Sequence, residues 1–305
     1  MSQNTGKTPE FASDPAATLA LRVLSKVIAL CRMVKIEHSV FALPFAFMGA
    51  FAAVEGVPPL RDLLLLTVAM VCIRSFAMAF NRIVDVRYDA LNPRTANRPL
   101  ITGEITFVQA WIFCVVMAIG FIWSAWHMNM LCFALSPLAL FLAGFYSYTK
   151  RFTWLCHYIL GFMLSMAPMA GYLAITAEFD LPPMLLAAAV IFWVAGFDIF
   201  YACQDIDFDK EHGLHSVPEH FGIPTALVMA AFNHLNMVIF LFLAGYGFGY
   251  SWPWYVVVAA VAGLLFWEHR LVKPDDLSRV NMAFFILNAI VALILFCGLA
   301  AALFL

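Results

Sequence analysis

The chain is poor in charged residues. Asp, Glu, Lys and Arg make up only 12% of its 305 residues, while 64% are hydrophobic. An average soluble domain has roughly 25% charged residues, so this composition argues against an ordinary soluble protein. The seven cysteines include no C-x-x-C pair and have no histidines at ligand spacing, which argues against a disulfide framework or a zinc site.

The N-terminus lacks the order of a signal peptide. Residues 1–19 are rich in Ser, Thr, Asn, Pro and Ala, with no basic stretch followed by an apolar one, and we expect them to form a disordered cytoplasmic tail. Residues 20–36 place Arg22, Lys26 and Arg32 among aliphatic side chains. This mixture is typical of a helix in the headgroup region of a bilayer. We therefore predict an interfacial helix at the start of a single domain over 20–305.

Long apolar runs define the class of protein. A run of about 20 apolar residues is long enough to cross a bilayer as a helix. Nine such runs occur, at residues 38–56, 62–83, 106–126, 129–149, 154–176, 183–203, 225–249, 253–269 and 281–304. The sequence thus predicts an all-α, polytopic membrane protein with nine transmembrane helices.

The positive charges lie on one side of this arrangement. The N-terminal segment and the connections that follow the even-numbered spans contain all 17 Lys and Arg residues except Arg61 and Arg74. Cytoplasmic segments carry the excess of Lys and Arg in membrane proteins. We therefore expect a protein of the inner membrane, with these segments and the acidic clusters within them on the cytoplasmic side.

Two acidic clusters end the second and sixth predicted spans. Their residues recur at intervals of four, which places them on one face of a helix. The first cluster contains Asn81, Asp85 and Asp89, and the second contains Tyr201, Asp205 and Asp209. Stacked carboxylates repel each other, and Mg²⁺ relieves that repulsion while binding phosphate oxygens. Solvated loop carboxylates are the simpler interpretation, but two such clusters on the same side favour a metal-diphosphate site.

Further polar residues lie near these clusters. Asp198 precedes Asp205 by two helical turns, roughly 10 Å deeper in the span, where a carboxylate needs a polar cavity, a cation or a donor. Tyr146, Lys150 and Arg151 lie at the end of the fourth predicted span. The two bases either extend toward the headgroups or clamp a phosphate, Lys as a point charge and Arg as a fork.

The loops after the two clusters resemble each other. Asp85 and Asp205 are 120 residues apart, and each cluster is followed by a polar loop with a proline and a glycine. This predicts two pseudo-repeated four-helix units plus a ninth span, with cytoplasmic cap loops at about 84–105 and 204–224. Arg94 and Arg98 in the first loop are either positive-inside charges on a rigid loop or part of a lid over the site.

These motifs resemble those of the UbiA superfamily of intramembrane prenyltransferases. That family carries N-D-x-x-D-x-x-x-D after span 2, D-x-x-Y-x-x-x-D-x-x-x-D after span 6, and Y-x-x-x-K at the end of span 4. The second pattern is complete here, and the third is matched by Tyr146 and Lys150. The first departs from the family at Arg82, where many members have Asp. Segments such as Phe-Asn-Arg-Ile-Val-Asp look like the 4-hydroxybenzoate polyprenyltransferase-like branch, which includes members of the futalosine route to menaquinone.

The resemblance implies a Mg²⁺-dependent enzyme of quinone biosynthesis. It would transfer a polyprenyl group from a diphosphate to a ring carbon of 4-hydroxybenzoate or a dihydroxynaphthoate, through an allylic carbocation. The implied metal ligands are Asn81, Asp85, Asp89, Asp205 and Asp209. The implied diphosphate-binding residues are Asn81, Arg94, Arg98, Tyr146, Lys150 and Arg151. The implied catalytic residues are Lys150, Arg151, Asp198 and Tyr201. Asp198 would be either the base that removes the ring proton or the residue that orients Tyr201. Membrane lipid is an expected partner, and nucleic acid is not.

Other functions compete with this interpretation. An ion-coupled transporter also combines many spans with paired acids, although transporter sites lie near the midplane at broken helices. A UbiA-type prenyltransferase with a different acceptor is the nearer alternative. A CDP-alcohol phosphotransferase is also helical and uses Mg²⁺, but its D-G-x-x-A-R signature is absent. Neither the acceptor nor the length of the prenyl chain follows from the motifs.

Overall fold

A computed structural model describes residues 15–35, 43–282 and 286–305 of the chain. Within these ranges the protein is helical, with one isolated β-bridge between Lys273 and Asp276 and no strand. The α-helices are α1 (Pro15–Val34), α2 (Leu43–Val54), α3 (Leu60–Val84), α4 (Val86–Leu91), α5 (Phe107–Met128), α6 (Met130–Thr149), α7 (Cys156–Thr176), α8 (Leu181–Ala202), α9 (Ile206–His212), α10 (Val217–Phe221), α11 (Ile223–Gly247), α12 (Trp252–Leu271), α13 (Val280–Met282) and α14 (Asn288–Phe304). A 3₁₀ helix, η2 (Cys203–Asp205), joins α8 to α9.

Seven of these helices are long and apolar enough to cross a membrane: α3, α5, α6, α7, α8 with its extension, α11 and α12. The helical, membrane-type fold is thereby confirmed. The shorter apolar helices α2 and α14 correspond to the first and last predicted spans. Those spans begin in residues 38–42 and 281–285, which lie wholly or partly outside the described residues. The count of nine and the two repeated four-helix units stay predictions.

Helix α1 differs from its prediction at its N-terminal end. It begins at Pro15, so residues 15–19 are helical where the sequence predicts a disordered tail. A proline is well tolerated in the first turn, where its missing N–H is not needed. The rest of the predicted tail, residues 1–14, lies outside the described residues. Ala29 and Met33 of α1 are buried against Ile83 of α3 and Ile105 ahead of α5.

The main apolar core joins α2, α7, α8, α11, α12 and α14. Its buried aromatic members include Phe45, Trp193 and Trp254, each at most 4% exposed. Small residues allow α2 and α7 to approach closely. A Cβ atom added to Gly49 would lie 1.9 Å from the backbone oxygen of Pro168, and one added to Gly171 would lie 1.8 Å from that of Ala46. Such backbone proximity is a common way to pack membrane helices.

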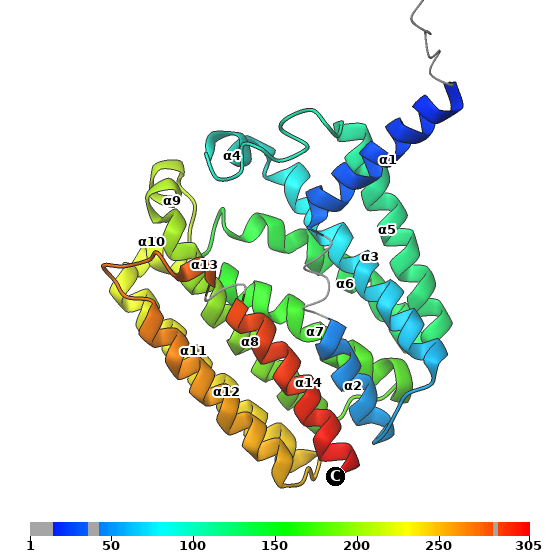
Figure 1. Ribbon diagram of the computed structural model, residues 1–305, viewed down its shortest axis with the longest axis vertical. Helices are drawn as coiled ribbons and strands as arrows, with labels where there is room; N and C mark the ends of the chain where they lie inside the picture. The colour runs from blue at the N-terminus through cyan, green and yellow to red at the C-terminus, as the bar shows by residue number, and fades with distance from the viewer. Residues whose placement is uncertain (1–14, 36–42, 283–285) are drawn as a thin grey trace, which may run out of the picture.

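Both acidic clusters lie where a long helix breaks and a short one begins. Asp85 (φ −92°, ψ 7°) separates α3 from α4, and Asp205 (φ −105°, ψ 8°) ends η2 just before α9 begins. The prediction that each cluster forms one continuous helical stripe is therefore wrong. Both aspartates adopt the same bridge-region conformation, which is sparsely populated and frequent at active sites. The short helices α4, α9 and α10 gather at this end of the bundle (Figure 1).

Candidate functional site

The two acidic clusters meet at one end of the bundle, and each of their four carboxylates is paired with a cation. The ion pairs join Asp85 with Arg151 at 3.0 Å, Asp89 with Arg98, Asp205 with Arg94 at 2.5 Å, and Asp209 with Lys150 at 2.8 Å. All eight residues belong to the site that the sequence predicts. The structure therefore brings the predicted acids and bases together as neutral pairs.

Arg94 links the two halves of the site. Besides its contact with Asp205, its Nη1 donates a hydrogen bond to the Tyr201 hydroxyl at 2.6 Å, and its guanidinium lies 5.0 Å from the centre of the tyrosine ring. A second connection runs from the backbone N–H of His215 to the backbone oxygen of Lys150 at 2.7 Å. The loop after α4 thus contacts the second cluster, and Arg94 is bound to residues of that cluster instead of being a solvated loop charge.

A cavity of about 110 Å³ opens between the clusters. Its walls combine the ends of α3, α6, α7 and α8. The lining residues are Asn81, Asp85, Tyr146, Ser147, Thr149, Lys150, Cys156, His157, Asp198, Tyr201, Ala202 and Asp205. Asp89 and Asp209 are not among them; these two aspartates are 8% and 0% exposed. The cavity is thus polar at the clusters and continues to Asp198 on α8.

The charges at the mouth of this cavity are incompletely balanced. Burial raises the pKa of Asp85, and the hydrogen bonds from Arg151 and from Asn81 Nδ2 (2.7 Å to Oδ2) do not offset that effect. Burial alone would lower the pKa of Lys150, but the carboxylates of Asp209 and Asp205 raise it above its ordinary value. Lys150 is therefore a cation at neutral pH, while Asp85 would gain from additional positive charge nearby.

Asp198 forms part of a hydrogen-bond chain that includes a residue missed by the sequence analysis. His157, which is 2% exposed, lies with Nδ1 2.7 Å from Oδ2 of Asp198, and the backbone N–H of Val217 donates to its Nε2 at 3.1 Å. Because Nε2 accepts, the proton must lie on Nδ1, which donates to Asp198. The sequence did contain a sign of this role, because His157 is an ionisable residue inside a predicted span, and such residues tend to be functional.

Arg82 also lies at the site, at the position where the first motif departs from the family pattern. Its side chain is 9% exposed, and Nη1 donates to Oδ1 of Asn81 at 3.2 Å. Asn81 in turn donates to Asp85. Arg82 therefore holds the amide of Asn81 in one orientation, so that its NH₂ group faces Asp85.

The donor set has the chemistry of a hard-cation site. Its acids and Asn81 offer oxygen ligands, which Mg²⁺ prefers. Across the described residues, the side chains form no preassembled group of three or more His, Cys, Asp or Glu ligands. The four ion pairs explain this, because each carboxylate is turned toward a basic partner. The residues fit Mg²⁺ in type and would have to exchange their basic partners for it.

The helical membrane architecture and the paired acidic clusters define an integral membrane protein with a polar site at one end of its bundle. Residues 42–303 match the model of the UbiA prenyltransferase family. The chain belongs to this family, as its motifs indicate.

Relatives and solved structures agree with this assignment. A 4-hydroxybenzoate octaprenyltransferase of Tolumonas auensis is 29% identical over 250 residues, which cover 82% of this chain and 87% of that protein. The apo structure of a UbiA homolog from Aeropyrum pernix K1 superposes with a TM-score of 0.79 at 34% identity, covering 87% of this chain and 98% of that one. A UbiA homolog from Archaeoglobus fulgidus bound to GPP and Mg²⁺ has the same fold, with a TM-score of 0.69 at 21% identity, covering 89% and 99%.

Proposed function

We propose that this protein is a Mg²⁺-dependent aromatic polyprenyltransferase of quinone biosynthesis. It would transfer a polyprenyl group from its diphosphate to a ring carbon of an aromatic hydroxy acid. The observation that carries this proposal is the meeting of two acidic clusters and four basic side chains around one cavity, in a chain of the UbiA prenyltransferase family. A diphosphate with bound cations needs both kinds of group within a few ångströms.

The basic residues would bind the diphosphate of the donor. Lys150, Arg151, Arg94 and Arg98 would turn from their aspartates toward non-bridging oxygens, with Tyr146 beside them in the cavity wall. Asn81, Asp85, Asp89, Asp205 and Asp209 would hold the metal ions. Bound Mg²⁺ would neutralise the charge that develops on the leaving diphosphate. The UbiA homolog bound to GPP and Mg²⁺ supports this metal and this class of donor.

The deeper part of the cavity would protect the carbocation from water and provide the base that accepts the ring proton. Apolar helices surround this region and exclude water from a reactive cation. Once the aromatic ring has attacked, a ring proton must be removed. We assign this role to Asp198, because His157 holds one of its oxygens and Asp198 itself lines the cavity. His157 would act as a positioning residue that holds the carboxylate of Asp198 in one orientation. Tyr201 would act with Arg94 on the donor.

The acceptor is an electron-rich phenolic acid. Curated relatives named 4-hydroxybenzoate octaprenyltransferase favour 4-hydroxybenzoate and a long donor, and a dihydroxynaphthoate remains the second candidate. The positive-inside distribution of Lys and Arg favours an active site on the cytoplasmic side of the inner membrane.

The decisive experiment offers both acids to the purified protein. Geranyl diphosphate is incubated with 4-hydroxybenzoate or a dihydroxynaphthoate, with Mg²⁺ or with EDTA, and prenylated product is measured by mass spectrometry. We expect a carbon-prenylated product with one acid, and none in EDTA. Asp207→Ala should behave like the parent protein, because Asp207 is exposed and occupies a position that the motif leaves unspecified. Product formation that is equal in EDTA would overturn the metal-dependent mechanism, and failure with both acids would overturn the proposed acceptor class.

A further inference from the structure

A groove separate from the polar site lies between α1 and α5. We call it the α1–α5 groove; it has a volume of about 250 Å³ and is lined by Lys26, Leu30, Ile105, Gln109, Ile112, Phe113 and Val116. None of these residues lines the cavity between the acidic clusters. On α5 the lining side chains recur at intervals of three and four, so they form one stripe facing α1. The groove thus lies between α1, which packs on α3, and the first turns of α5.

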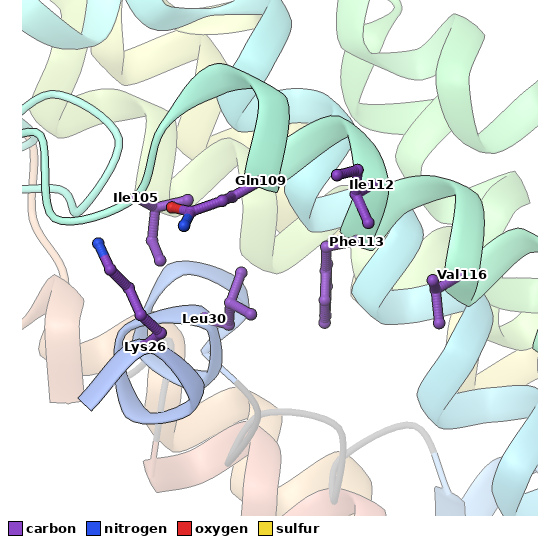
Figure 2. Close-up of a pocket in the computed structure, with 7 residues that line it drawn as sticks. All are labelled: Lys26, Leu30, Ile105, Gln109, Ile112, Phe113 and Val116. Carbon is purple, nitrogen blue, oxygen red and sulfur yellow. The ribbon is translucent and has the colours of Figure 1, made fainter. Parts of the chain in front are cut away.

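The polar groups of the groove lie at one end. Figure 2 shows the amine of Lys26 and the amide of Gln109 on the same side, with Phe113 and Val116 farther along α5. Lys26 contacts the backbone oxygen of Glu104, whereas the carboxylate of Glu104 is bound by Arg32. Among the described residues Lys26 therefore forms no ion pair with a carboxylate, although its amine contacts a backbone oxygen at the polar end of the groove.

Gln109 adds a donor beside this charge. Its Oε1 accepts the backbone N–H of Thr106 at 3.0 Å, and its own backbone N–H donates to Thr106 Oγ1 at 3.2 Å, which completes a capping box at the start of α5. Because the side-chain oxygen is committed, the amide nitrogen is the part of Gln109 left to donate. No hydrogen bond is formed by that nitrogen within the described parts of the chain. The polar end thus presents donors and positive charge, which suit an anion.

The rest of the groove suits a hydrocarbon chain. Ile112 and Val116 are 58% and 52% exposed, and Leu21, Val23 and Leu24 on α1 are more than half exposed. Apolar side chains on the outer faces of both helices are expected where a protein meets lipid. Basic pockets between membrane helices on the cytoplasmic side bind anionic lipid headgroups. A free anion would leave the apolar wall uncovered, and an uncharged hydrocarbon would leave the charge of Lys26 without a counter-charge.

We propose that the α1–α5 groove binds one anionic phospholipid. Its phosphate would lie beside Lys26 and Gln109, and one acyl chain would follow the apolar wall formed by Ile112, Phe113 and Val116. Leu100 and Ile105, which end the loop that carries Arg94 and Arg98, pack in the same apolar cluster as Ala29 and Met33 of α1. The lipid would therefore lie next to the anchor of that loop and would fill the space between α1 and α5.

The test measures lipid binding by native mass spectrometry on delipidated, full-length protein in detergent. Phosphatidylglycerol should bind with one tight site, and phosphatidylcholine should bind at least 10-fold more weakly. Lys26→Ala should weaken phosphatidylglycerol binding by about 10-fold, in line with the loss of one charge-assisted hydrogen bond, while Lys26→Arg should retain it. The matched control is Lys273→Ala, another exposed lysine on the predicted cytoplasmic side and away from the groove.

A second variant tests the apolar wall independently of Lys26. Val116→Trp places a large side chain in the groove from an exposed position, so it should fold normally and weaken phosphatidylglycerol binding. The proposal is overturned if Lys26→Ala and Val116→Trp both bind as the parent does, or if Lys273→Ala loses as much affinity as Lys26→Ala. Equal binding of phosphatidylcholine would also overturn it. Displacement of the lipid by an equal concentration of glycerol phosphate would show a site for free anions, which contradicts a lipid site.

Discussion

Asp85 and Asp205 are equivalent in backbone conformation and in their basic partners, so their replacement should have equivalent effects. Each lies at a helix break, lines the cavity and pairs with an arginine. We expect Asp85→Ala and Asp205→Ala each to reduce turnover below about 1% of the parent, because each variant would lose one carboxylate ligand of the proposed metal site. Both proteins should still insert and elute as the parent does in size-exclusion chromatography.

Near-normal activity of either variant at saturating Mg²⁺ would contradict the proposed metal site. Asp207→Ala is the control, since Asp207 lies between two site aspartates but is exposed.

Lys150 and Arg151 should differ in their effect on stability although both serve the donor. Each replacement by Ala should raise the Michaelis constant for the prenyl diphosphate by roughly 10- to 100-fold, because each loses a charge-assisted hydrogen bond worth about 1.5–3 kcal/mol. Lys150→Ala also leaves the fully buried Asp209 without its cation, so its melting temperature should fall more than that of Arg151→Ala. Steady-state kinetics and thermal melts separate the two effects.

The exposed Lys210 provides the control for these measurements, and Lys210→Ala should change neither quantity. A raised Michaelis constant for the aromatic acid, with that for the diphosphate unchanged, would reassign both residues to the acceptor.

For single residues, the sequence predicted which side chains belong to the site better than it predicted which of them form ion pairs. The spacing of Asp85, Asp89, Asp205 and Asp209 identified the acids, because ionisable groups at the end of an apolar run are costly and tend to be functional. Their partners could not be derived, because Arg94 and Asp205 are far apart in sequence and meet only through the fold. His157 was missed because one histidine in an apolar run has no spacing to indicate its partner.

At the scale of elements, the topology of the loops is the central prediction. The contacts of Arg94 with Asp205 and of His215 with Lys150 place the loops after α4 and α9 at the same end of the bundle. A single cysteine placed in the 92–97 loop, or in the 211–216 loop, should therefore react from the cytoplasmic side, and one in the 178–182 loop only from the opposite side. The measurement is labelling of intact cells with an impermeant maleimide, with the exposed Cys297 replaced by Ser.

Labelling of the two acidic loops from opposite sides would rule out a shared diphosphate and would favour the transporter alternative.

The packing of α2 on α7 depends on two glycines. We expect Gly49→Ala and Gly171→Ala to lower the melting temperature strongly or to prevent accumulation, because each added Cβ would meet a backbone oxygen within 2 Å. Gly263→Ala on α12 is the matched control: nothing lies within 4 Å of its added Cβ, and alanine favours a helix by up to about 1 kcal/mol. A thermal melt in detergent distinguishes these outcomes. Equal melting temperatures for all three variants would show that the close α2–α7 contact is not needed.

The helix breaks illustrate what hydropathy leaves undetermined. Apolar runs located the long helices to within a few residues, because bilayer crossing demands a continuous apolar surface. The interval of four in each acidic cluster also fits a continuous helix, so nothing in the local pattern distinguishes it from a helix that ends at Asp85 or Asp205. The breaks depend on contacts with loops that come from other parts of the chain.

For the whole molecule, hydropathy and charge distribution were sufficient to predict a helical membrane fold, and the family match agrees. In each acidic cluster an aspartate of the same backbone conformation precedes a short helix, α4 or α9. The two repeated four-helix units stay a prediction. Oligomeric state and prenyl chain length depend on surfaces and cavities, whose shape is set by side chains distant in sequence.

The four ion pairs have a thermodynamic consequence for the proposed reaction. Mg²⁺ alone must displace four bases from their aspartates, and a diphosphate alone must draw those bases away and leave the aspartates exposed to one another. When both ligands bind, Mg²⁺ takes the aspartates and frees the bases for the diphosphate, while the diphosphate takes the bases and frees the aspartates for Mg²⁺. Their affinities should therefore be coupled, and reciprocity requires the same factor in both directions. Isothermal titration should show Mg²⁺ binding at least 10-fold more tightly in the presence of inorganic pyrophosphate, beyond the complex that the two form in solution.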